Sequence, residues 1–181
     1  MIENQAQTFN AATPGFFSHF AGMRAKKSSD AHVNVGTCAF FDNFPEQQLS
    51  QLLKLASLKK YSPGEHITSA ASPSLASFFV ILSGNATVYA NDMSLGLVHG
   101  GECIGEGIFI ENKRPTMATV VANTQVVALE VTKQAVDSLS EEIRLHIDKA
   151  LVRALFKKLQ RSNVLNELLH KQWVASLWKH S

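Results

Sequence analysis

A glutamate set between two glycines is the stretch of this chain whose residue types most favour binding chemistry. In Gly105-Glu106-Gly107 the backbone can come close to a ligand, because glycine carries no Cβ. If Ile108 begins a helical turn, its free N–H groups point at the same spot and favour an anion. The stretch therefore predicts a glycine-framed anion site.

Short strands are expected to lead to this stretch. Apolar or alternating runs separated by Gly, Asn and Pro turns occur at residues 66–68, 78–82, 86–89, 95–98, 118–122 and 126–131. Many short strands at this spacing predict a mainly β domain, an antiparallel jelly-roll barrel with flanking helices. An amphipathic helix is expected from Pro45 through the leucines up to Lys59-Lys60. Thr132 is expected to cap a short helix.

A long C-terminal helix is expected after the strands. The chain has no glycine beyond Gly107 and no proline beyond Pro115, and both residues disfavour helix interiors. The step of six between the apolar Leu159 and Leu165 leaves open one long helix or two with a joint at residues 162–163.

One apolar seam of this helix predicts a homodimer. Its members recur at steps of four: Ile143, Ile147, Leu151, Leu155 and Leu159. The alternative is that the seam packs on the chain's own barrel. A basic stripe also follows steps of four, and we interpret it as a solvated face; it comprises Lys149, Arg153, Lys157 and Arg161, with Lys158 beside it.

Composition excludes several classes of function. The net charge is +2 and the two cysteines, Cys38 and Cys103, lack metal-ligand spacing, so we expect no metal site and reduced core thiols in a cytoplasmic protein. No apolar run approaches the roughly 18 residues of a membrane span. The histidines are scattered and no nucleophile motif occurs, which indicates that the chain is not an enzyme.

Three motifs follow one another along the chain. They are Tyr-Ser-Pro-Gly-Glu at 61–65, Phe79 to Gly84 followed by Val88-Tyr89, and Gly105-Glu106 followed by Ala118-Thr119-Val120. In this order they resemble the cyclic-nucleotide-binding domain of catabolite activators and protein kinase regulatory subunits, over about residues 38–160. The first looks like the family's entry to its first strand, the second like its Ile-x-x-Gly-x-x-x-Val segment, and the third like its phosphate-binding cassette and the next strand.

The resemblance implies roles for individual residues. Glu106 would accept a hydrogen bond from the ribose 2′-hydroxyl, and backbone N–H groups near Gly107 and Ile108 would face the cyclic phosphate. The family carries an arginine three residues before the threonine of its Ala-Thr-Val, and here that position is Thr116. A hydroxyl supplies one donor where a guanidinium fork supplies charge and two donors.

Two neighbours of Thr116 bear on the same site. Arg114 lies two residues upstream and is either a substitute for the missing arginine or a solvated loop charge. Met117 falls where guanine-selective members of the family often carry threonine or serine, and its thioether donates no hydrogen bond. The resemblance therefore implies cyclic AMP or a related cyclic nucleotide, without support for guanine.

The resemblance also implies an organisation and a function. We expect an N-terminal extension, partly helical, over residues 1–37, a cyclic-nucleotide-binding-like jelly roll over 38–138 and a C-terminal helical segment over 139–181. The chain would be a regulatory sensor that signals through this helix to an unknown protein effector. Residues 162–181 are too few for the helix-turn-helix domain that catabolite activators place there. The alternative is a ligand-free module of the same fold that serves dimerisation or partner binding.

Overall fold

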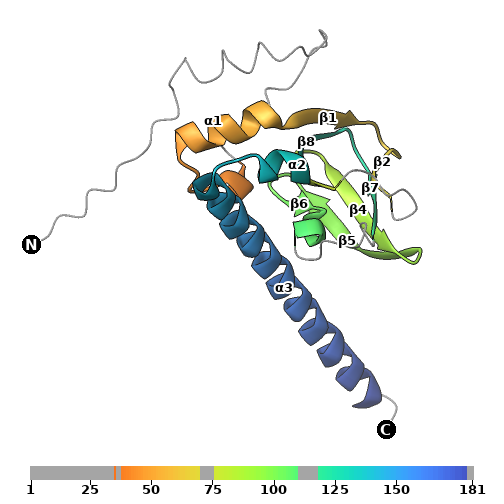
Figure 1. The fold of residues 1–181 in the computed structure, drawn as a ribbon. Coiled ribbons are helices and arrows are strands. Elements are labelled where there is room, and N and C mark those ends of the chain that lie inside the picture. The colour runs from red at the N-terminus through yellow and green to blue at the C-terminus, as the bar shows by residue number, and fades with distance from the viewer. Residues whose placement is uncertain (1–34, 36–37, 70–75, 110–117, 179–181) are drawn as a thin grey trace, which may run out of the picture. The chain divides into compact units, whose positions relative to one another are not determined.

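The computed structural model describes residues 35, 38–69, 76–109 and 118–178, all within the unit Val33–Ser181 (Figure 1). The helical part predicted for the N-terminal extension lies outside the described residues, as do the candidate site residues Arg114, Thr116 and Met117. The division at residues 37 and 138 stays a prediction.

Two antiparallel sheets form the body of this unit. In the described part of the chain the strand orders are β1-β8-β3-β6 and β2-β7-β4-β5. The strands are β1 (Ser57–Tyr61), β2 (His66–Thr68), β3 (Ser77–Ser83), β4 (Asn85–Ala90), β5 (Met93–His99), β6 (Cys103–Ile104), β7 (Thr119–Ala122) and β8 (Val126–Thr132). Most consecutive strands lie in opposite sheets, as they do in a jelly roll. The predicted fold class is therefore confirmed.

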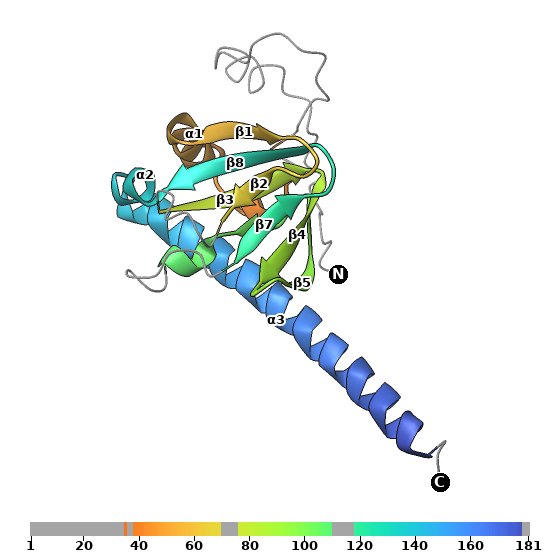
Figure 2. The same ribbon diagram turned by 90° about the vertical axis from the view of Figure 1, so that its right-hand side faces the viewer.

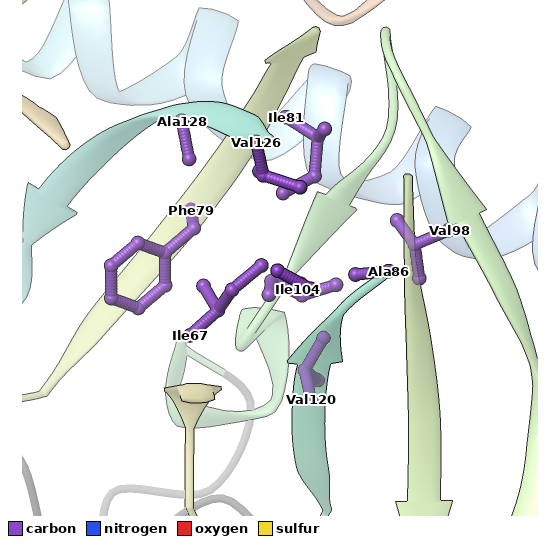
Figure 3. Packing of buried hydrophobic residues seen from close by; sticks show 10 residues of the cluster. Ile67, Phe79, Ile81, Ala86, Val98, Ile104, Val120, Val126 and Ala128 are labelled. Atoms are coloured by element: carbon purple, nitrogen blue, oxygen red, sulfur yellow. The ribbon is translucent and has the colours of Figure 1, made fainter. Parts of the chain in front are cut away.

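Side chains from both sheets meet in one apolar core (Figure 3). Phe79 and Ile81 of β3 face Ile67 of β2 and Val120 of β7 across this core, and Ile104 of β6 joins them. Because the sheets bury these faces together, each strand alternates between the core and the other side.

Strand β3 is buried on both faces, which explains its continuous apolar run. Phe78 and Val80, on the face away from the inter-sheet core, are 0% exposed. The Phe78 ring lies 5.7 Å from Phe40 and 5.3 Å from Phe109, measured between ring centroids. Thus β3 packs against helical segments on one side and against the opposite sheet on the other.

Helices flank the sheets. They are η3 (Ala39–Phe41), α1 (Glu46–Leu55), η4 (Glu106–Phe109), α2 (Lys133–Asp137) and α3 (Glu141–Trp178). The predicted cap of α2 is confirmed, because the Thr132 hydroxyl oxygen accepts a hydrogen bond from the Ala135 N–H at 3.0 Å.

The predicted extent of the first long helix was wrong. Helix α1 ends at Leu55, and residues 57–61 form β1, which pairs with β8 from Ser57↔Glu130 to Tyr61↔Val126. The first four residues of β1 are exposed, and Leu58 is 42% exposed. Because the exposed strand β1 shows no alternation of burial, its sequence carries no strand signal. The leucine spacing therefore predicted that the helix continues, whereas pairing with β8 makes this segment a strand.

Helix α3 runs for 38 residues without a joint at residues 162–163 (Figure 1). Its seam residues Ile143, Ile147 and Leu151 are 1%, 0% and 5% exposed, so this part of the seam packs on the chain's own domain. The prediction that these three residues serve a second subunit was wrong. Leu159, the last member of the seam, is 57% exposed.

Among the described helices, none is long and apolar enough to cross a membrane.

Replacing a docking residue of α3 tests this packing. We expect Ile147→Ala to lower the free energy of unfolding by about 2–5 kcal/mol, because it opens a cavity at a fully buried site. Leu95→Ala, at a position 60% exposed on β5, should change it by less than about 0.5 kcal/mol. Urea denaturation followed by circular dichroism measures both; equal, small effects would contradict the docked α3.

Candidate functional site

The candidate site begins where β6 turns into η4, at a glycine that the fold requires. Gly105 has φ +82°, and a Cβ there would lie 2.7 Å from the Ser77 carbonyl oxygen and 3.3 Å from the Phe78 Cα. A side chain would therefore clash with the backbone of β3 and strain a left-handed residue. Gly107 meets no such restriction, since a Cβ there would have nothing within 4 Å.

The helical turn expected near Ile108 is present as η4, which begins at Glu106. The pairing of β6 with β3, through Phe79↔Ile104 and Val80↔Cys103, leads the chain into this turn. Gly105, Glu106, Gly107 and Ile108 thus lie at one end of β6, and their role as a ligand site stays a prediction.

The Glu106 carboxylate is mostly removed from water and is held by α3. Its side chain is 13% exposed, and Lys158 Nζ lies 2.5 Å from its Oε1. The ammonium is 35% exposed. A carboxylate withdrawn this far from water needs a partner of opposite charge, and here a helix that begins 35 residues after Glu106, at Glu141, supplies it.

A second ion pair joins α3 to the same segment. Arg161 Nη2 donates to Glu102 Oε1, and Glu102 Oε2 accepts a hydrogen bond from the His99 N–H at 2.8 Å. Burial disfavours the ionised Glu102 carboxyl, but the bonds from Arg161 and His99 outweigh burial and hold its pKa below the ordinary value. The paired carboxylate in turn raises the pKa of Arg161.

A third contact fixes α3 one and a half turns before Lys158. Arg153 Nη2 donates to the backbone carbonyl of Asp42 at 2.9 Å and to that of Phe40 at 3.4 Å. The interpretation of the basic stripe as a solvated face was therefore wrong for Arg153 and Lys158, whereas Arg161 is 58% exposed although it pairs with Glu102. Lys149 and Lys157 are exposed.

A shallow hollow lies along this side of α3. Its lining combines Phe40 of η3, Glu102 and Cys103 before and within β6, and Arg153 and Lys158 of α3.

Cys103 is fully buried, and burial, followed by the charge of Glu106, raises the pKa of its thiol to about 12. The thiol is therefore no nucleophile near neutral pH.

Sequence reasoning missed Lys158 and Arg161 as partners of the site. They lie 52 and 59 residues from Glu106 and Glu102, so no local motif links them. One signal existed: Ile147, Leu151, Ala154 and Lys158 follow steps of four, three and four, so Lys158 continues the buried face of α3.

Comparisons with known proteins agree with this fold. Residues 58–142 match the family model described as the cyclic nucleotide-binding domain. No curated protein sequence matches the chain.

Solved structures share the fold at low sequence identity. A cyclic nucleotide-binding domain from Methylobacillus flagellatus superposes with a TM-score of 0.63 at 19% identity, covering 72% of this chain and 76% of that one. PKAR CBD2 bound to Sp-2Cl-cAMPS gives 0.55 at 24% identity, covering 76% and 84%.

The Thermus thermophilus catabolite activator protein gives a TM-score of 0.58 at 17% identity, covering 73% of this chain and only 63% of that one. The chain thus corresponds to part of that activator. The motifs, the two-sheet topology and the family match agree, and they relate residues 58–142 of this chain to the cyclic nucleotide-binding domain family.

Proposed function

We propose that this domain is a regulatory sensor that binds a cyclic mononucleotide, with cyclic AMP the first choice, at the Glu106 turn. The observation that carries the proposal is the position of Glu106, an acceptor 13% exposed at the end of β6 and in direct contact with α3. Lys158 is its partner among the described residues and engages Oε1. Because a carboxylate has about four lone-pair sites, Glu106 can accept a ribose hydroxyl while it keeps Lys158.

The proposed signal leaves through α3. A ligand can shift a conformational equilibrium only through contacts that differ between two states. The Glu106–Lys158 pair supplies such a contact, since it joins the proposed ligand acceptor to the helix itself. The effector would be a protein of unknown identity, and we infer a non-catalytic role for the domain. Cys38 and Cys103 are buried and unpaired, which favours the reducing cytoplasm.

A ligand-free module of the same fold is the second candidate function. Thr116 favours it, because the family's arginine is replaced there by a residue without charge. The pairing of Glu106 with Lys158 also favours it, because the carboxylate already has a partner without any ligand. Arg114 would have to supply the charge from a segment that lies outside the described residues.

Calorimetric titration with cyclic AMP, cyclic GMP and cyclic di-GMP decides between the two. The sensor should give saturable heat with cyclic AMP, and 2′-deoxy cyclic AMP should bind about 10–100-fold more weakly, since a charge-assisted hydrogen bond contributes about 1.5–3 kcal/mol. Absence of saturable heat with every cyclic nucleotide at millimolar concentration would establish the ligand-free module instead.

Glu106→Gln should remove the preference for the 2′-hydroxyl. We expect it to weaken cyclic AMP binding about tenfold and to bring the 2′-deoxy analogue to nearly equal affinity, because the charge of the acceptor is lost. Glu167→Gln is the matched control, since this carboxylate is 65% exposed and pairs with Lys171 within α3. A Glu106→Gln protein that still discriminated against the 2′-deoxy analogue would place the hydroxyl elsewhere.

We also propose that α3 pairs with a second copy of the chain through its outer face. The outer face is defined by Leu145, Val152, Phe156 and Leu159, which are 50%, 65%, 58% and 57% exposed. Steps of seven, four and three place them on one side of a helix, opposite the docked Ile147. This spacing is typical of the apolar face through which two helices pair. In this proposal the outer face takes the role that the sequence prediction gave to the seam beginning at Ile143.

The outer-face dimer predicts a change in mass. Val152→Glu with Phe156→Glu should shift the protein from dimer to monomer in size-exclusion chromatography with light scattering, because two charges would enter the apolar seam. Lys149→Glu, also exposed on α3, should leave the dimer intact. A monomeric mass for the unsubstituted chain would exclude the dimer.

A further inference from the structure

Three side chains of α3 contact two neighbouring parts of the domain, the η3 turn and residues 102–106. Arg153 binds backbone carbonyls of Phe40 and Asp42, Lys158 binds Glu106, and Arg161 binds Glu102. Lys158 is the middle contact, flanked five residues earlier and three residues later. Because α3 is held at Arg153 and at Arg161, the Lys158 ammonium between them has a defined position.

The burial of the pair separates it from an ordinary surface salt bridge. Exposed ion pairs contribute little, about 0–1 kcal/mol, because water screens both charges. Here the carboxylate is 13% exposed and the ammonium 35% exposed, so the carboxylate is the more desolvated partner and the ammonium keeps a face toward solvent. The Lys158 ammonium is therefore an accessible hydrogen-bond donor next to the more buried Glu106 carboxylate.

Charge decides what such a site can accept. Glu102 and Glu106 place two carboxylates within one short segment, and without cations they would repel an anionic ligand. Arg161 and Lys158 neutralise them. Arg161 is directed to Glu102, which also binds the His99 N–H, whereas an ammonium has three donors and Glu106 uses one of those of Lys158.

We propose that Lys158 is a specificity-determining residue of the ligand site: it keeps its contact with Glu106 and donates a second hydrogen bond to the anionic phosphate of the ligand. This inference rests on the proposed function, because it assumes that a cyclic nucleotide occupies the Glu106 turn. It assigns to α3 a positive charge that the site needs. A ligand would then bind only while α3 is docked, and would strengthen that docking.

Lys158→Met tests this role. We expect cyclic AMP to bind about 10–100-fold more weakly to the full chain carrying this change, while Lys158→Arg keeps most of the affinity because it restores a donor with charge. Lys171→Met is the control, since Lys171 pairs with Glu167 on the same helix at 67% exposure and away from the site. Thermal unfolding shows whether each variant is folded, and Lys158→Gln replaces the methionine variant if that one is not.

The salt dependence of binding separates a direct contact from a structural one. Binding of cyclic AMP to the unsubstituted chain should weaken as salt rises, and Lys158→Met should reduce this dependence, because the cation that attracts the phosphate is gone. Lys158→Met should also lower affinity further in the Glu106→Gln background, since the phosphate contact does not act through Glu106.

The outcomes are distinct. Tighter or unchanged binding by Lys158→Met, or no effect in the Glu106→Gln background, would overturn the inference while leaving the sensor function intact. Tighter binding would mean that Lys158 competes with the ligand for Glu106. No binding of any cyclic nucleotide by the unsubstituted chain would overturn the sensor function, and the inference with it.

Discussion

The ion pair between Glu106 and Lys158 is the constraint around which the site is arranged. A carboxylate only 13% exposed loses most of its hydration, and the charge of the nearby Lys158 ammonium offsets that loss. The cation comes from a helix that follows the whole barrel in sequence. The geometry of the Glu106 turn is therefore linked to the docking of α3.

Apolar packing and one glycine position the two partners. Ile143 and Ile147 are buried against the domain and determine which face of α3 is turned inward, and this face continues through Ala154 to Lys158. On the other side, Gly105 turns the chain so closely against β3 that no side chain is tolerated. The views in Figures 1 and 2 show η4 beside α3, where these two requirements meet. Hydrophobic contact thus positions the charges, and the charges then fix the local geometry.

The sequence predicted the parts of the structure that carry a local signal. Alternating residue types mark β4, and a β-branched run marks β7. A continuous apolar run marks β3, which is buried on both faces, and a hydroxyl side chain marks the helix cap at Thr132. Strand β1 gave no such signal, because its exposed residues are held by the ladder to β8. Lys158 was missed for a related reason: an ion pair across 52 residues depends on tertiary packing, which helical periodicity shows only as a face. The roles of Arg114, Thr116 and Met117 stay predictions.

The two faces of α3 link the proposed ligand site to the proposed dimer. The inner face carries Lys158 to the turn, while the outer face exposes Val152 and Phe156. Across its 38 residues the helix contains neither glycine nor proline, the usual sites of sharp kinks. A shift at Lys158 would therefore move the helix as one body, since no hinge lies between the two faces. Under the proposed function, ligand binding and subunit pairing are coupled through the orientation of a single rigid element, and each must alter the affinity of the other by the same factor.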